Sequence, residues 1–213
     1  MRMRKKKWAD PFIESNPQFV IPDPQAYKGK WKEKFNKDIL HVEIGTGKGD
    51  YFINMATMYP DEAWLGIEKD HSCGAVAAKK SIDANLANQL MIIDDASELT
   101  DWFDNKEIDV IHLNFSDPWP KKRNSKRRLS HNSFLKKYYD LLSDDGQIIL
   151  KTDNAKFFEF SLVELTHNNF SLENVWVNFR QEEQPEDAIT EYESKFISLN
   201  QPIYRAIFVK VIK

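Results

Sequence analysis

The chain is nearly free of cysteine, since only Cys73 among 213 residues carries a thiol. One thiol excludes a disulfide scaffold and a cysteine-rich zinc site, and it favours a reducing, cytoplasmic compartment. No stretch approaches the roughly 18 to 20 consecutive apolar residues of a membrane-spanning helix, so we expect no membrane partner. The basic start, MRMRKKK, runs into polar sequence without an apolar core, and we therefore expect no secretory signal.

The composition lacks the features of a disordered chain. Hydrophobic residues make up 41% and charged residues 30%, which is typical of a globular protein. A chain of this length buries roughly 70% of its unfolded surface, so it needs no disulfide or metal to hold it together. No internal repeat or low-complexity linker interrupts it. We expect a single domain at 38–213, preceded by an irregular, polar, proline-containing arm at 1–37.

The chain has no large excess of positive or negative charge, because its formal net charge is only −3. The basic residues are nevertheless gathered in two places: residues 1–8 hold five and residues 121–128 hold six, and neither segment contains an acidic residue. The remainder of the chain is strongly acidic. Two basic segments on an acidic body favour local contact with a polyanion. For residues 1–8, a merely solvated tail explains the pattern equally well.

Short apolar runs alternate along the chain with segments of helical apolar spacing. The expected strands are 39–44, 63–68, 90–93, 108–115 and 147–152, with two more β-rich runs around 170–179 and 203–212. The expected helices are 50–58, 71–86, 98–104, 131–142 and 155–167, and the arm has at most a short helix near Trp31. Five strand–helix alternations predict an α/β fold with a doubly wound, mostly parallel sheet, and the late runs bring it to seven strands.

The first expected strand ends in a glycine loop that points to a cationic ligand. Gly45, Gly47 and Gly49 allow a sharp turn and a close approach of the backbone to a ligand. Their G-x-G-x-G spacing differs from the G-x-G-x-x-G of dinucleotide sites, and no phosphate-binding P-loop motif is present. Glu43, two positions before the first glycine, would repel a pyrophosphate but suits a ligand with an ammonium and a sulfonium.

Acidic residues also follow the next two strands. Glu68 stands at the end of the second strand, where a carboxylate can accept hydrogen bonds from both hydroxyls of a ribose. Asp94 and Asp95 follow the third strand, and one of them can bind the adenine amino group; Asp95 is the better choice because the small Ala96 follows it. With the glycine loop, these residues favour S-adenosylmethionine over a nicotinamide cofactor.

The fourth strand leads into a stiff loop with an acid, an aromatic ring and basic residues. Asp117 lies at the carboxyl end of the strand, where we expect the methyl group. Pro118 and Pro120 fix the backbone around Trp119, whose ring offers a face for a base. Lys121 and the basic run behind it can neutralise phosphates. This order of residues is typical of a site for a nucleobase within a polyanion.

SerAspProTrpProLysLysArg at 116–123, with LysArgArgLeu at 126–129, resembles the bacterial tRNA (guanine-N7-)-methyltransferases. The resemblance covers nearly the whole chain. Its other matching segments are MRMRKKKWAD at 1–10, GluIleGlyThrGlyLysGly at 43–49, GlyIleGlu at 66–68, LysThrAspAsn at 151–154, ThrGluTyrGlu at 190–193, LysPhe at 195–196 and GlnProIleTyrArg at 201–205.

The resemblance implies a Rossmann-like methyltransferase fold and methyl transfer from S-adenosyl-L-methionine to N7 of guanosine 46 in the tRNA variable loop, with S-adenosyl-L-homocysteine as product. It implies no metal. The expected cofactor residues are Glu43, Gly45, Gly47, Glu68, Asp95 and Asp117, and Asp117 is also the expected catalytic residue. The expected substrate residues are Lys121, Asp153, Thr190, Glu191, Tyr192 and Glu193, and the expected RNA contacts are Arg123, Asn124, Ser125, Lys126, Arg127 and Arg128.

Chemistry limits the role of Asp117. Guanine N7 has a lone pair and no proton, so its attack on a sulfonium methyl group requires no base. Positive charge leaves the sulfur and appears on the guanine ring, and a fixed carboxylate can stabilise that charge. We therefore expect Asp117 to anchor the guanine and stabilise the developing charge. The other carboxylates suit the N1–H and amino donors of guanine, and Tyr192 can stack.

Three alternatives remain at this stage. An adenine amino-methyltransferase shares an Asp-Pro dipeptide after the fourth strand, but Trp119 and Pro120 depart from its Asp-Pro-Pro-Tyr motif. A non-catalytic RNA-binding module would bind tRNA and tolerate the loss of Glu43. An NAD-dependent oxidoreductase is disfavoured by the glycine spacing and the basic loop. Whether the protein is a monomer or a homodimer stays open.

Overall fold

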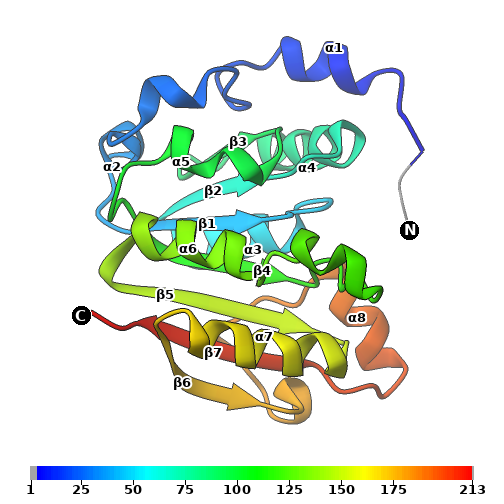
Figure 1. Cartoon of the computed structure of the whole chain (residues 1–213). Coiled ribbons are helices and arrows are strands. Elements are labelled where there is room, and N and C mark those ends of the chain that lie inside the picture. Colours follow the sequence, from blue (N-terminus) through cyan, green and yellow to red (C-terminus); the bar gives the residue numbers. More distant parts are fainter. Residues whose placement is uncertain (1–3, 213) are drawn as a thin grey trace.

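In the computed structural model, residues 4–212 are described, so Met1, Arg2, Met3 and Lys213 lie outside the described part. Seven strands form one sheet in the order β3-β2-β1-β4-β5-β7-β6 (Figure 1). Their bounds are β1 Leu40–Ile44, β2 Ala63–Ile67, β3 Gln89–Ile92, β4 Ile108–Asn114, β5 Leu142–Thr152, β6 Phe170–Trp176 and β7 Tyr204–Lys210. Strands β1 to β5 pair in parallel, whereas β7 pairs antiparallel with both β5 and β6. The predicted mostly parallel, seven-stranded sheet is confirmed.

Helices cover both faces of this sheet. The longer ones are α3 Asp50–Met58, α4 His71–Ala84, α6 Asn132–Leu141, α7 Ala155–His167 and α8 Glu191–Ser198. The shorter ones are α1 Ala9–Glu14, α2 Trp31–Phe35, α5 Leu99–Trp102, and the short 3₁₀ helices η1 Pro24–Tyr27, η2 Ala96–Glu98, η3 Lys122–Arg127 and η4 Phe179–Gln181. One core cluster contains Tyr138 of α6 and Phe157 of α7; the other contains Phe52 of α3 and Ala77 of α4.

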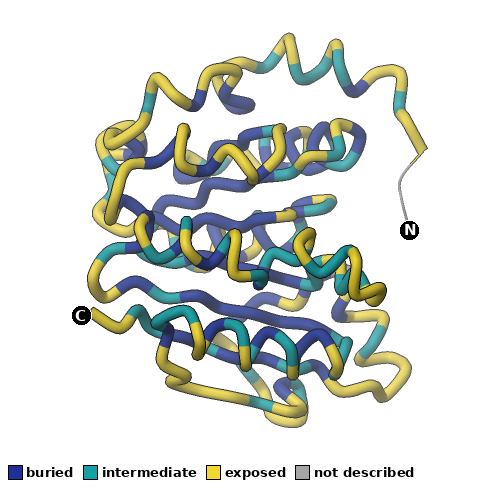
Figure 2. The backbone as a smooth tube through the Cα atoms, viewed as in Figure 1, coloured by how far each residue is buried: buried dark blue, intermediate teal, exposed yellow. Residues whose placement is uncertain are grey.

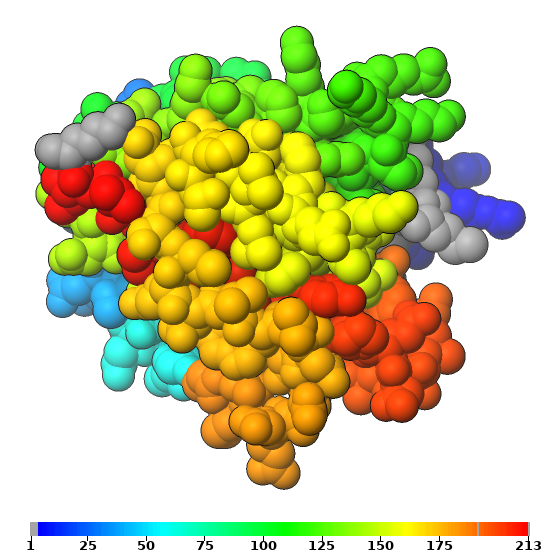
Figure 3. All heavy atoms as spheres, turned by 60° about the horizontal axis from the view of Figure 1, so that its bottom comes forward, coloured from blue at the N-terminus to red at the C-terminus, as the bar shows by residue number. Residues whose placement is uncertain are grey.

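The strand order places a crevice at one edge of the sheet. The chain runs outward from β1 to β3 and then returns to the other side of β1 with β4. In such sheets the loops after the two central strands separate, and ligands bind beyond the carboxyl ends of the strands. Strands β1, β2 and β3 are buried throughout (Figure 2). The sheet ends on one side in β3 and on the other in β6, whose middle residues are exposed (Figure 3).

The lead-in arm is more ordered than the sequence predicts. The predicted turn of helix near Trp31 is present, but α1 was not expected. The indole of Trp31 is fully buried, and its Nε1 donates to the carbonyl of Trp102 at 2.8 Å. Val20 forms a parallel bridge with Met91 of β3. Large apolar side chains therefore fix the arm to the sheet, although its prolines give it an irregular sequence pattern.

Two other boundaries differ from expectation. The segment predicted as a helix at 98–104 splits into η2 and the single-turn α5. Strand β5 begins at Leu142, before the AspAspGly sequence that we expected to separate the helix from the strand. Leu142 pairs with Ile108, and the register then shifts before Val110 pairs with Gln147. The AspAspGly sequence therefore forms an irregularity within the strand.

Candidate active site

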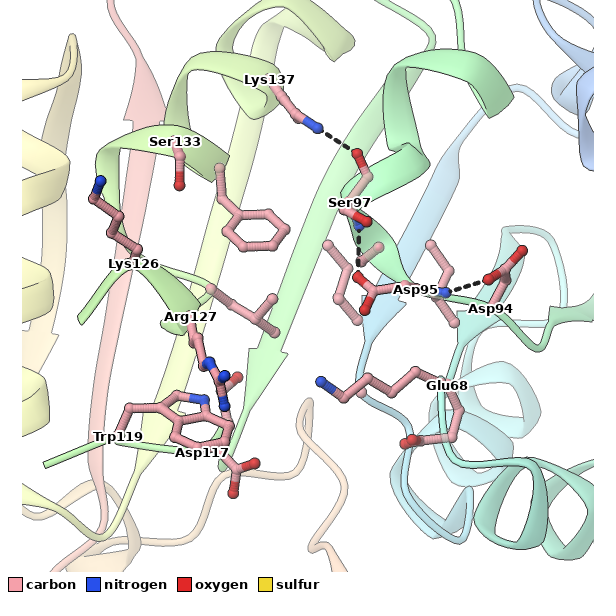
Figure 4. A pocket seen from close by; sticks show the side chains of 18 of the residues that line it. Glu68, Asp94, Asp95, Ser97, Asp117, Trp119, Lys126, Arg127, Ser133 and Lys137 are labelled. Atoms are coloured by element: carbon pink, nitrogen blue, oxygen red, sulfur yellow. Dashed lines mark hydrogen bonds between the residues drawn. The ribbon is translucent and has the colours of Figure 1, made fainter. Parts of the chain in front are cut away.

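A cavity of about 720 Å³ opens beyond the carboxyl ends of β1, β2, β3 and β4 (Figure 4). Of the predicted site residues, Gly45, Glu68, Asp95, Asp117, Lys126 and Arg127 line it. Figure 4 shows Glu68, Asp94 and Asp95 on one wall and Asp117, Trp119 and Arg127 on the opposite wall. The structure thus brings residues from four separate loops to a single space.

The glycine loop after β1 has the backbone conformation that its composition predicts. Gly45 and Gly47 have φ of +85° and +57°, in the left-handed region where L side chains are strained. A Cβ atom at either position would meet no described atom within 4 Å, so the space beside this backbone is open to a ligand. Conformation rather than crowding therefore requires glycine at both positions.

Glu43 lies beneath this loop, buried rather than lining the cavity. Its Oε1 accepts a hydrogen bond from Asn114 Nδ2 at 2.8 Å. Its Oε2 and Asn114 Oδ1 are buried without a hydrogen-bond partner among the described residues. Burial raises the pKa of Glu43 to about 7, although Asn114 and Lys151 act in the opposite direction. Two unpaired buried acceptors are costly, and a cationic group of a ligand would satisfy them.

Glu68 is held in place by two backbone donors. Gly47 N donates to Oε2 and Asp70 N donates to Oε1, each at 2.9 Å. Burial raises the pKa of Glu68 from its ordinary value. Glu68 lines the cavity, where its fixed carboxylate can accept hydrogen bonds from a vicinal diol.

Asp95 stands at the carboxyl end of β3 and caps the turn η2. Its Oδ1 accepts from the backbone N–H of Ser97 at 2.9 Å, and its own backbone N–H donates to Asp94 Oδ1 at 2.7 Å. Both aspartates line the cavity. Lys137 of α6 closes this side, where its Nζ donates to the carbonyl of Ser97 (Figure 4).

The loop after β4 has a strained backbone on either side of Asp117. Phe115 and Trp119 have φ of +49° and +39°, values that are uncommon for bulky residues. Asp117 is exposed at the cavity wall. The guanidinium carbon of Arg127 lies 4.9 Å from the centre of the Trp119 ring. The acid, the ring and the cation therefore share one wall.

The basic residues that follow do not share one environment. Lys126 and Arg127 line the cavity, and Lys121 and Arg123 are exposed beside it. Asn124 and Ser125 lie in η3, half-buried. Arg128 differs because its side chain is directed at the backbone of the Asp117 loop, where Nε and Nη2 donate to the carbonyls of Pro118 and Trp119 at 2.9 and 3.1 Å.

The segment that leads into α8 is anchored by a buried ion cluster. Lys151 Nζ lies 2.6 Å from Asp187 Oδ2 and 3.3 Å from Glu193 Oε2. Arg180 contacts the same two carboxylates, at 2.6 Å each. Three of these four side chains are at most 1% exposed, and Arg180 is 9% exposed. The cluster fixes α8 against the end of β5.

Two of the expected substrate residues form the N-terminal cap of α8. Thr190 and Glu193 form a capping box, in which Thr190 Oγ1 accepts from Glu193 N at 2.8 Å and Glu193 Oε2 accepts from Thr190 N at 3.2 Å. The Glu193 carboxylate is fully buried, where it stabilises the start of α8, and a contact with substrate stays a prediction. Tyr192 is exposed, with its ring 5.5 Å from that of Phe115.

Other expected substrate residues lie at the margin. Asp153 is half-buried after β5, and burial raises its pKa, but it does not line the cavity. Glu191 begins α8. Sequence analysis missed Asn114 and Lys137. A polar Asn114 at the end of an otherwise apolar strand was a usable signal, whereas the position of Lys137 depends on how α6 packs.

Among residues 4–212, no helix is long and apolar enough to cross a membrane. Nor does that part of the chain hold a group of three or more metal-binding side chains.

Comparison with known proteins agrees with this geometry. A family model described as "Putative methyltransferase" matches residues 37–206. A tRNA (guanine-N(7)-)-methyltransferase of Geobacillus kaustophilus is 46% identical over 211 residues, covering 99% of this chain and 97% of the relative. One of Limosilactobacillus reuteri is 43% identical over 209 residues, covering 97% and 98%.

A solved structure shares the fold at low identity. The 30S ribosomal A1408 methyltransferase from an uncultured bacterium superimposes with a TM-score of 0.60 at 18% identity, covering 86% of this chain and 93% of that one. The seven-stranded sheet, the glycine loop and the full-length similarity to curated relatives lead to one assignment: the chain belongs to the tRNA (guanine-N7-)-methyltransferase family.

Proposed function

We propose that this protein transfers the methyl group of S-adenosylmethionine to N7 of a guanosine in tRNA, and that the target is guanosine 46 of the variable loop. The family assignment and the cavity support the reaction class. The observation that carries the proposal is the pair of facing walls: acids suited to an adenosine on one, and Asp117 with Trp119 and a basic segment on the other. Because its substrate is matured inside the cell, we place the enzyme in the cytoplasm.

The residues present fit S-adenosylmethionine. Bound there, this molecule supplies an electrophilic methyl group on a sulfonium. Glu43 Oε2 and Asn114 Oδ1 would accept hydrogen bonds from its ammonium group, since both are buried acceptors without a partner among the described residues. Glu68 would bind the ribose hydroxyls, and Asp95 the adenine amino group. Gly45 leaves room for close approach of the backbone.

Asp117 and Trp119 would handle the guanine. Trp119 provides an aromatic face at the cavity wall, and a stacked base is typically worth about 1–3 kcal/mol. Asp117, held on the rigid loop, would orient the base and stabilise the positive charge that develops on it. The guanine N7 needs no proton removed, so this role requires only an ionised, fixed carboxylate. Lys126 and Arg127 would neutralise neighbouring phosphates.

The test uses purified protein, labelled S-adenosylmethionine, and two unmodified tRNA transcripts that differ only in the variable-loop guanosine. We expect label in the transcript that has this guanosine and none in the other. Base-specific cleavage at N7-methylguanosine then maps the modified nucleotide and atom.

Two results would contradict the proposal. Binding of tRNA without methyl transfer would indicate an RNA-binding module. Transfer to another base or atom would retain the cofactor site but overturn the roles of Asp117 and Trp119.

A further inference from the structure

Arg128 has contacts unlike those of the other basic residues in its segment. It is half-buried, whereas Lys121, Arg123 and Lys126 are exposed. Its guanidinium donates from Nε to the Pro118 carbonyl at 2.9 Å and from Nη2 to the Trp119 carbonyl at 3.1 Å. Two of its five donors are thus directed at the loop that carries Asp117.

The loop needs these donors because of its own composition. Pro118 and Pro120 have no backbone N–H, so the loop has few internal donors with which to satisfy its carbonyls. Trp119 also has a φ of +39°, which persists only where the surroundings enforce it. The two hydrogen bonds reach successive peptide groups, Pro118–Trp119 and Trp119–Pro120, so one planar guanidinium fixes the two carbonyls relative to each other.

Arg128 is itself fixed by α7. The guanidinium carbon lies 4.2 Å from the centre of the Phe160 ring, on α7. The Asp117 loop is therefore braced through Arg128 against a helix of the core.

We propose that Arg128 is a positioning residue that holds the Asp117–Trp119 loop in its reactive geometry, and that it is not primarily an RNA contact. The inference rests on the proposed function. It assigns to Arg128 a role distinct from that of its neighbours Arg123 and Lys126, although all three belong to one basic run. The geometry of the side chain, rather than its charge alone, is what the loop requires.

The test compares Arg128→Lys with Ser130→Ala. Lysine retains the charge but is a point donor without the planar fork, so it cannot make both hydrogen bonds in the same geometry. Ser130→Ala removes a fully buried hydroxyl whose 2.7 Å hydrogen bond goes to Ser161 and not to the Asp117 loop, so it controls for a general loss of stability. For each variant we would measure thermal stability, kcat at saturating tRNA and cofactor, the Kd for tRNA, and amide hydrogen exchange across 115–127.

We expect Arg128→Lys to lower kcat at least 10-fold, to change the Kd for tRNA less than 2-fold, and to speed exchange at 115–127. We expect Ser130→Ala to lower thermal stability but to leave kcat and the exchange at 115–127 as they are in the wild type. A kcat within 2-fold of wild type, or equal loss of kcat in both variants, would overturn the inference. If the wild-type protein transferred no methyl group, the proposed function would be wrong. Separately, unchanged amide hydrogen exchange at 115–127 in Arg128→Lys would show that Arg128 does not hold the loop in place.

Discussion

At the scale of single residues, Glu43 makes the stability of the folded protein depend on pH. Its pKa is about 7 in the folded protein, compared with 4.5 for an ordinary glutamate, mainly because the carboxyl group is buried. The folded state thus binds a proton that the unfolded state has released between these pH values. The contribution of this group to stability is present below about pH 4.5 and is lost as the pH rises through about 7.

Replacing Glu43 with glutamine removes the buried charge. We expect Glu43→Gln to be more stable than wild type at pH 8, by about 1–3 kcal/mol, with a smaller difference at pH 5. Affinity for S-adenosylhomocysteine should fall at least 10-fold, because its ammonium group loses a carboxylate partner. Urea unfolding at the two pH values and calorimetric titration measure both effects. A stability difference independent of pH would contradict this account.

Replacing Asp117 with asparagine keeps its shape and removes its charge. We expect kcat to fall about 100-fold with tRNA and cofactor saturating, which is the usual cost of removing an electrostatic contact made in the transition state. Asp101→Asn, at an exposed position on the short helix α5, is the matched control and should retain wild-type kcat. Wild-type kcat in Asp117→Asn would rule out the charge-stabilising role.

The positions of Glu68, Asp95 and Asp117 could be predicted because each follows a strand of a parallel sheet, and such strand ends meet at one edge. The roles of Arg128 and Glu193 could not. Arg128 satisfies carbonyls in a loop about ten residues away, and Glu193 pairs with Lys151 at a distance of 42 residues along the chain. Neither partner is visible in a local pattern, and the family resemblance suggested an RNA contact for Arg128 and a substrate contact for Glu193.

At the scale of elements, the buried ion cluster that anchors α8 should make the protein sensitive to the loss of one of its cations. Lys151→Met leaves Asp187 and Glu193 buried with Arg180 as their remaining cation. Breaking a buried pair in this way typically costs about 3–5 kcal/mol. We expect a corresponding fall in the free energy of unfolding in urea. Lys79→Met, in an exposed pair on α4, should have little effect; similar losses in both variants would contradict the account.

The extent to which an element buries apolar residues explains whether it could be predicted from the sequence. Strands β1 and β2 are fully buried, and most of their residues are apolar, so a sequence pattern reveals them. Helix α1 buries only Ala9, which leaves no helical stripe of apolar residues to detect. The start of β5 was missed because its polar AspAspGly residues lie within a register shift. Elements that are stabilised mainly by tertiary contacts therefore cannot be recognised from local sequence patterns.

At the scale of the whole molecule, the described residues 4–8 of the first basic segment and the second basic segment, residues 121–128, lie at the edge of the sheet where the cavity opens. The turn η3 follows β4, and the backbone N–H of Lys6 donates to Ser72 Oγ at the start of α4, which follows β2 (Figure 1). The acidic remainder of the surface repels RNA, so the two segments direct it to this edge. A protein with a net charge of −3 can therefore bind a polyanion at one site.

This distribution predicts how tRNA binding depends on salt. Each phosphate neutralised by a lysine or arginine contributes about 0.7 to 0.9 to the slope of log Kd against log salt concentration. Arg123→Ala should lower this slope by about 1 and weaken binding at low salt, because the exposed side chain faces solvent beside the cavity. Asp117→Asn removes no phosphate contact and should leave the slope unchanged. Filter binding at several salt concentrations measures both, and equal slopes for Arg123→Ala and wild type would show that this arginine makes no phosphate contact.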